Sequence, residues 1–339
     1  MNQRTDGAVV IRLAYEAVCR SGLPVENIFK NTHLMQKQMG VYQRIPQQAQ
    51  YSFWKEMVAV SQDADIGLHL GEHLPLFRGQ IIEQLFVSSS SFGEGLQRTL
   101  PYQRLISDAF QATLVVEGNE CYLKNNKQPH PNNLVNRHFS ECAMFGVIQF
   151  FKFMTDGAFK PKRIDFDFRE GAQASEYVRV YHCPVSLGQV ETRLYFDTEI
   201  LNYQLWQAEP ELLHLHEGFA SKKLVELTYY DLIDDVRAVI ARSLKQGEIT
   251  LEMIATDLGM SARQLRHRLQ EANTSFQQLL GEYRCRLSKR LLKDSSESIE
   301  QIVVLTGFAE PSTFYRAFKR WTNETPIEYR KRKQSPPSI

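Results

Sequence analysis

Two short segments near the end of the chain gather side chains that donate hydrogen bonds from the outer face of a helix. The first holds Arg263, Gln264, Arg266, His267 and Arg268. The second holds Ser312, Thr313, Tyr315, Arg316, Lys319 and Arg320. In the major groove of DNA, Arg can bond both acceptors of guanine, and Gln can bond adenine at two positions. These residue types therefore favour the recognition of a DNA sequence.

The donors of the first segment are positioned by a pattern of helix, tight turn and helix. Thr250 can cap a helix whose apolar residues recur at helical spacing. Gly259 permits a sharp reversal, because a residue without a side chain readily adopts positive φ. Ser261 can cap the next helix. In that helix Leu265 and Leu269 point inward and leave the donors outside.

The second segment follows a copy of the same pattern. Gly307 makes the turn, and Pro311 lies in the first turn of the next helix, where no amide donor is missed. We predict the two helix-turn-helix units at about 251–272 and 299–322. A continuous helical pattern over 276–292 joins them and is about 25 Å long at 1.5 Å per residue. Two recognition helices held by such a strut can reach major-groove segments about 34 Å apart.

The charge of this part of the chain favours the same partner. From Gly259 to the end there are 15 Lys and Arg against 8 Asp and Glu, although the whole chain has a formal net charge of +1. Such an excess supplies nonspecific affinity for DNA through the release of counterions. Four basic residues of the connecting helix could also face phosphates: Arg284, Arg286, Lys289 and Arg290.

This half of the chain resembles the AraC-type transcriptional regulators over roughly residues 233–333. The matching marks are the twin units, Arg284 with Leu291-Leu292, Gly307-Phe308, and Pro326-Ile327-Glu328-Tyr329-Arg330. Asn273 and Asn323 stand where the family usually has glycine, and asparagine is the next best residue for a left-handed turn. Ser288 and Val303 replace small alanines in tight packing.

The resemblance implies which residues face the groove. They are Arg263, Gln264, Arg266 and His267 in the first unit, and Pro311, Ser312, Tyr315 and Arg316 in the second. The alternative for any one basic residue is a solvated surface role. Because the second unit has few base-reading donors beyond Arg316, we expect the first recognition helix to supply more of the discrimination and the second more of the backbone grip.

The rest of the chain is long enough for a further domain. A length of 339 residues favours two or three domains, and no apolar run approaches the roughly 20 residues that a membrane span needs. Charged residues interrupt the first twenty positions, which argues against a secretory signal. The five cysteines form no C-x-x-C pair, so a reduced cytoplasm fits and a disulfide scaffold does not.

The first 230 residues read as an α+β domain with helices packed on a small sheet. Helices are expected around 9–19, 51–61, 92–110 and 134–154. Strands are expected at 112–117, 121–124, 163–168 and 192–196. Gly118-Asn119 separates the first two strands as a hairpin turn. The predicted fold class is therefore an α+β effector domain followed by an all-α domain with two helix-turn-helix units joined by a long helix.

This first half is similar to the effector domain of the AraC-type subfamily that includes the ornithine-utilisation regulator. The marks are Gly67-Leu68-x-Leu70-Gly71-Glu72, Phe92-Gly93-Glu94-Gly95-Leu96 with Tyr102, and Cys183-Pro184-Val185 with Gly188. The likeness implies a ligand-sensing or dimerising module. It does not name the ligand, because relatives respond to chemically different small molecules.

We predict an effector-sensing or dimerisation domain at 1–209, a helical linker at 210–232, the DNA-binding domain at 233–333 and a flexible tail at 334–339. Six apolar residues of the linker helix are expected to point inward: Leu212, Leu213, Leu215, Phe219, Leu224 and Leu227. This helix is either an internal packing element or a segment that transmits an effector-induced change or pairs two chains.

Smaller constellations suggest no enzyme. His69-Leu70-Gly71-Glu72-His73 spells H-x-x-E-H, a zinc peptidase string, but Gly71 weakens the helix that would carry it. His214 and His216 point to different helix faces, and Cys183 lacks the motif of an alkyl-acceptor cysteine. We expect no catalytic residue, no metal and no cofactor.

The predicted function is that of a bacterial, cytoplasmic transcription activator controlled by a small molecule. Its expected partners are double-stranded promoter DNA, RNA polymerase, an unidentified small-molecule effector bound to the N-terminal domain, and a second copy of the chain in a homodimer; no membrane is expected. The alternative is a constitutive or architectural DNA-binding protein whose N-terminal domain serves only dimerisation.

Overall fold

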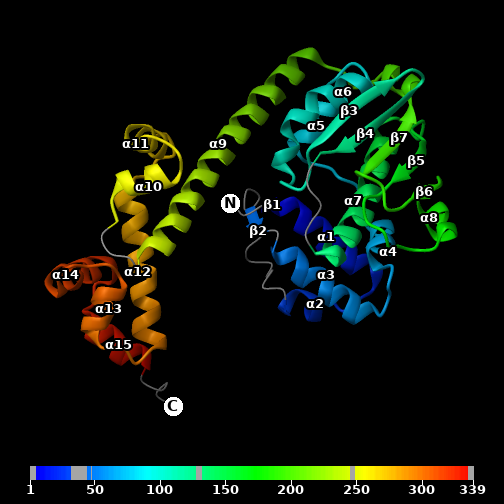
Figure 1. Ribbon diagram of the computed structural model, residues 1–339. Helices are drawn as coiled ribbons and strands as arrows, with labels where there is room; N and C mark the ends of the chain where they lie inside the picture. The colour runs from blue at the N-terminus through cyan, green and yellow to red at the C-terminus, as the bar shows by residue number, and fades with distance from the viewer. Residues whose placement is uncertain (1–4, 32–43, 47, 127–131, 245–248, 335–339) are drawn as a thin grey trace. The chain divides into compact units, whose positions relative to one another are not determined.

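The computed structural model describes residues 5–31, 44–46, 48–126, 132–244 and 249–334 (Figure 1). The chain forms two compact units, with the boundary between Leu224 and Val225. The first unit combines helices with a sheet, and the described part of the second is helical. The predicted fold class, an α+β domain followed by an all-α domain with two helix-turn-helix units, is confirmed.

Among the described residues, the main sheet of the first unit has five strands in the order β3, β4, β7, β5 and β6. They are β3 Ala112–Glu117, β4 Glu120–Asn125, β5 Pro161–Asp165, β6 Val185–Ser186 and β7 Arg193–Asp197. Neighbouring strands are antiparallel except β5 and β6. β3 and β4 form the expected hairpin, and Gly118 in its turn has a φ of 61°, which favours glycine.

The first unit also contains helices, and a short antiparallel pair of strands lies near the start of the chain. The helices are α1 Ala8–Ser21, α2 Val25–Asn31, α3 Gln48–Ser61, α4 Ile66–Glu72, α5 Ile81–Val87, α6 Phe92–Thr99, α7 Asn133–Met154 and α8 Ala174–Tyr181. The short pair is β1 Thr5–Gly7 and β2 Arg44–Pro46. Helix α7 contributes to two hydrophobic clusters, through Ile148 and Phe151 to one and through Val135 and Cys142 to the other.

One predicted helix is shorter than expected. The pattern over 92–110 predicted a continuous helix, but α6 ends at Thr99 and a 3-10 helix continues over Leu100–Leu105. Pro101 lies in this segment and has no amide hydrogen to donate to an α-helical bond. The expected helix is therefore divided where the proline removes a donor.

Glycines let α4 approach α7 closely. A Cβ at Gly67 would lie 2.7 Å from the Cβ of His138, and one at Gly71 would lie 2.9 Å from the Cβ of Phe145. Both distances are shorter than real carbon contacts, so the side chain of alanine would not fit without movement of α7. The Gly67-x-x-x-Gly71 spacing thus explains the packing of these two helices, in spite of the helix-weakening effect expected of Gly71.

The described cysteines differ in accessibility. Cys121, Cys142 and Cys183 are buried free thiols, whereas Cys19 on α1 is exposed and Cys285 in the second unit is half-buried. Burial raises the pKa of Cys121 and Cys183 to about 11 and that of Cys142 to about 12. The three buried thiols are thus held in the protonated form.

The second unit begins within α9 and continues through six further helices of the described chain. They are α9 Pro210–Ser243, α10 Leu251–Asp257, α11 Ala262–Glu271, α12 Phe276–Asp294, α13 Ile299–Leu305, α14 Pro311–Thr322 and α15 Pro326–Gln334. In Figure 1, α12 runs from the α10–α11 pair to α13, α14 and α15. Asn273 and Asn323 have φ of 54° and 60°, so the expected left-handed conformation of both asparagines is confirmed.

The first half of α9 is only partly buried. Leu213 packs with Leu85 of α5, whereas Leu212, Leu215 and Phe219 are exposed. The prediction that these three residues point inward was wrong, because their side of the helix faces solvent. No helix in the described part of the chain is long and apolar enough to cross a membrane.

Candidate nucleic-acid interface

The first helix-turn-helix is built from α10 and α11. The Thr250 hydroxyl accepts a hydrogen bond from the amide of Met253 at 3.2 Å and caps α10. Gly259, with a φ of 69°, makes the turn. Leu265 and Leu269 of α11 are buried in a cluster with Ile254 and Ala255 of α10 and with α9 and α12. This packing fixes the outward face of α11.

A reciprocal cap at the start of α11 engages one of the predicted base readers. The Gln264 amide donates to the Ser261 hydroxyl at 3.2 Å, and the Ser261 amide donates to Gln264 Oε1 at 3.0 Å. Bidentate bonding to adenine uses both the oxygen and the nitrogen of a glutamine side chain. Gln264 must therefore release this cap to read adenine with both atoms.

The other predicted residues of the first helix-turn-helix lie on the surface of α11. Arg263, Arg266 and His267 are all exposed, and His267 Nε2 lies 3.7 Å from Glu271. Arg263 and Arg266 are three residues apart on α11 and so share one face. The structure thus brings two guanidinium groups to the same exposed surface.

The second helix-turn-helix presents a different surface on α14. Phe314, Ala317 and Phe318 anchor α14, and Pro311, Ser312 and Arg316 are exposed. Tyr315 is half-buried and packs edge-on against Phe314, with ring centroids 6.1 Å apart. The Ser312 hydroxyl donates to the Glu310 carboxylate at 3.3 Å. The negative charge of Glu310 beside the start of α14 opposes the approach of a phosphate. This effect was not predicted from the sequence.

Arg316 also borders a hollow of about 380 Å³ between α12 and α14. Thr313, Arg320 and Trp321 of α14 and Gln277 of α12 contribute to its lining. Arg320 and Arg316 thus place two positive charges on one side of this hollow. Lys319 and Arg320 are exposed near the end of α14.

Comparison with known proteins accounts for both units. Residues 22–205 match the family described as the arabinose-binding domain of AraC transcription regulators, and residues 254–332 match a helix-turn-helix domain. The first match spans more than half of the chain. The chain belongs to the AraC family of transcription regulators.

Two relatives align with this AraC-family chain over most of their lengths. The ornithine utilization regulator of Pseudomonas aeruginosa is 26% identical over 274 residues, which are 80% of each chain. The uncharacterized HTH-type transcriptional regulator Rv1395 of Mycobacterium tuberculosis is 26% identical over 288 residues, 81% of each. Among solved structures, the transcriptional regulator CdpR from Pseudomonas aeruginosa has a TM-score of 0.46 at 18% identity, covering 90% of this chain and 96% of CdpR. The homologues are DNA-binding regulators, and the chain is not an enzyme.

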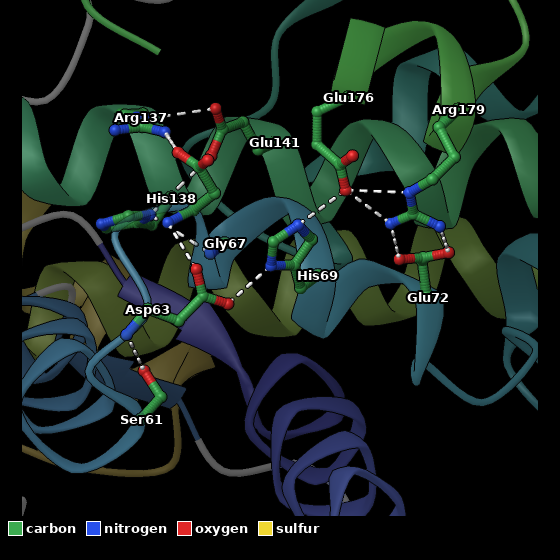
Figure 2. Close-up of polar contacts among 11 residues, drawn as sticks. Ser61, Asp63, Gly67, His69, Glu72, Arg137, His138, Glu141, Glu176 and Arg179 are labelled. Carbon is green, nitrogen blue, oxygen red and sulfur yellow. Dashed lines mark hydrogen bonds and ion pairs between the residues drawn. The ribbon is translucent and has the colours of Figure 1, made fainter. Parts of the chain in front are cut away.

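In this AraC-family protein, the H-x-x-E-H string forms ion pairs (Figure 2). His69 Nδ1 lies 2.5 Å from Asp63 Oδ2, and His69 Nε2 lies 2.9 Å from Glu176 Oε1. Glu72 accepts two hydrogen bonds from Arg179, at 2.9 and 2.6 Å. Within the described residues, no group of three or more His, Cys, Asp or Glu side chains is placed to hold a metal ion. The string therefore connects α4 to α8 and to the loop before α4.

A buried carboxylate lies next to this network. Glu141 of α7 accepts hydrogen bonds from Tyr177 Oη at 2.5 Å and from Arg137 Nε at 3.1 Å. Arg137 also pairs with Asp65 just before α4. These contacts attach α7 to α4 and α8 on one side of the N-terminal AraC domain.

Proposed function

We propose that this regulator binds specific promoter sites through both helix-turn-helix units and activates transcription under the control of a small molecule held by its first unit. The observation that supports DNA reading is the pair of exposed helix faces on α11 and α14, each fixed from behind by a buried cluster. A cavity of about 530 Å³ in the first unit supports effector control, since this volume suits a small molecule.

The proposed base-facing residues remain those expected from the sequence. They are Arg263, Gln264, Arg266, His267, Pro311, Ser312, Tyr315 and Arg316. We give Arg266 and Arg263 the leading role, because both guanidinium groups are exposed on α11. Tyr315 contributes less than its residue type suggests, because part of its ring packs on Phe314.

The regulator acts as a homodimer in this proposal. Leu212, Leu215 and Phe219 are exposed on α9 at spacings of three and four residues, the pattern by which two helices pair. Effector binding would favour one arrangement of the DNA-binding units, because a ligand shifts an equilibrium only towards the state that it binds better. The occupied promoter site would then recruit RNA polymerase in the cytoplasm.

Replacing Arg266 with alanine tests the DNA-reading surface. We expect a loss of about 1 to 3 kcal/mol in binding free energy at the specific site and relaxed preference at one base pair, because a bidentate contact to guanine is removed. Footprinting and quantitative gel shifts on specific and random duplexes would measure both effects. Arg20→Ala, at an exposed arginine of α1, is the matched control and should bind as the unmodified chain does.

Two outcomes would contradict the proposal. An equal loss on specific and random DNA would mean that Arg266 holds a phosphate. If affinity and promoter output do not respond to any ligand that the first unit retains, the chain is a constitutive or architectural DNA-binding protein.

A further inference from the structure

The cavity of the first unit lies where the two hydrophobic clusters face each other. Phe86 and Phe151 line it from one cluster, and Phe53 and Trp54 line it from the other. From α7, Phe139, Ala143, Gly146 and Val147 contribute to its wall. These α7 residues are only partly buried although they belong to a core helix. The wall is therefore mostly apolar and aromatic.

Three polar side chains of the wall away from the sheet, the inner wall, are already bonded to the protein: Gln50, Thr99 and Gln103. Gln50 Nε2 donates to Asp6 Oδ2 at 2.9 Å, and Gln50 Oε1 accepts from the Trp54 indole at 3.1 Å. The Thr99 hydroxyl donates to the Gly95 carbonyl at 2.7 Å. Gln103 bonds both backbone groups of Ala112, at 3.1 and 2.7 Å. A ligand inside would find few of these groups available for its own hydrogen bonds.

Charged side chains line the cavity on its sheet side. Lys124 Nζ lies 3.9 Å from Glu191 Oε1, with side chains 32% and 22% exposed. Asp167 accepts hydrogen bonds from Asn136 at 3.1 Å and from Thr192 at 3.3 Å. One cation and two carboxylates are therefore within reach of one end of a bound molecule.

We propose that this cavity binds a predominantly apolar small molecule whose single polar end lies at the Lys124–Glu191 pair. The inference rests on the proposed effector control and adds the chemical class of the effector. A sugar carries hydroxyls on every side, and ornithine carries two ammonium groups and a carboxylate. Burying such groups without partners is costly, and the inner wall offers few partners. The ligand class is thus different from the arabinose and the ornithine named for the matched family and relative.

Fluorescence of N-phenyl-1-naphthylamine with the full-length chain tests the site, because this neutral dye brightens in an apolar cavity. We expect saturable binding at one site per chain. Decanol and decanoate should displace the dye, whereas L-arabinose and L-ornithine should not do so even in large excess. The last pair tests the ligand class separately from the location of the site.

A cavity-filling substitution tests the location. Ala143→Phe on α7 should weaken dye binding by about tenfold or more, because the added ring occupies the cavity. Ala174→Phe makes the same change at an exposed position of α8 outside the cavity and should leave dye affinity unchanged. Circular dichroism establishes that each variant folds. If Ala143→Phe does not fold, Ala14→Phe on the α1 wall provides the same test.

Three results would overturn the inference: no saturable dye binding, equal affinity in folded cavity-filled and control variants, or displacement by ornithine or arabinose at the concentrations at which decanol acts. Gel shifts with decanoate and decanol examine effector control separately. Binding in the cavity without any effect on DNA affinity would leave the site intact and remove the effector role. If DNA affinity responds to a molecule that does not enter the cavity, effector control remains and this cavity is not the effector site.

Discussion

Arg284 shows that a basic residue of a DNA-binding unit can act on the protein instead of on DNA. Its Nη2 donates to the carbonyl of Gly307 at 2.5 Å, and its guanidinium group lies 4.5 Å from the ring centroid of Phe308. The sequence indicated that Arg284 could face phosphates. The structure shows that it attaches α12 to the turn of the second helix-turn-helix, so charge alone did not predict its role.

The charge of His69 should make the stability of the first unit depend on pH. Burial lowers the pKa of His69, but its hydrogen bonds with Asp63 and Glu176 outweigh burial, and the pKa is raised above 6.5. The stabilisation from protonated His69 is therefore fully present below about pH 6.5 and is lost as the pH rises through the raised value. His69→Gln should lower the urea midpoint of the first unit most near pH 6 and least above the raised pKa. Urea unfolding followed by circular dichroism at several pH values measures this difference.

His214→Gln is the matched control, since His214 is exposed on α9. Its urea midpoint should follow that of the unmodified chain at every pH. Glu176 stays ionised over the whole range, because hydrogen bonds from Arg179 and His69 lower its pKa. A His69→Gln difference that is constant with pH, or that grows as the pH rises, would contradict the charged bridge.

Because α4 and α7 are in close contact, one added methyl group between them should change the free energy of unfolding of the first unit. Gly67→Ala should destabilise the first unit by about 1 to 3 kcal/mol, because the new Cβ overlaps His138 and α7 must move. The free energy of urea unfolding measures the change. Gly218→Ala is the control, because nothing lies within 4 Å of a Cβ built at this glycine of α9.

The control should be stabilising by about 0.5 to 1 kcal/mol, because alanine favours a helix over glycine. If Gly67→Ala matched Gly218→Ala, the two helices would not be in the close contact that the structure gives them.

Long periodic elements, the hairpin and the short helices of the two helix-turn-helix units could be predicted from the sequence, whereas the short helices of the first unit could not. The positions of α7 and α12 follow from apolar spacing, and that of the β3–β4 hairpin follows from Gly118. Helices α2, α4, α5 and α8 have seven or eight residues, too few for a helical period to be recognised. The capping role of Gln264 and the exposure of Phe219 depend on neighbours that residue spacing does not reveal.

The two units of the molecule have separate hydrophobic cores. The clusters of the second unit contain buried residues from Leu232 to Phe318, and none of these belongs to the first unit. A fragment of residues 225–339 should therefore fold and bind the specific DNA site without the first unit. Thermal unfolding by circular dichroism and footprinting measure these two properties.

A fragment that begins at residue 249 provides the comparison. It lacks Leu232, Val236, Val239 and Ile240, which are buried against the first helix-turn-helix. Each buried aliphatic side chain contributes about 1.5 to 3 kcal/mol, so together they match the entire stability of a typical domain. The shorter fragment should lose cooperative unfolding. Equal stability of the two fragments would show that α9 is not part of the DNA-binding core.

The distribution of cysteines makes the natural chain suitable for distance measurements without engineered sites. Maleimides react with the thiolate, which is suppressed at the buried Cys121, Cys142 and Cys183. Cys19 in the first unit and Cys285 in the second are the more accessible thiols. A fluorescent donor and acceptor attached to these two residues would report the distance between the units in solution. The same labelled protein could then register any rearrangement when a ligand or a promoter duplex is added.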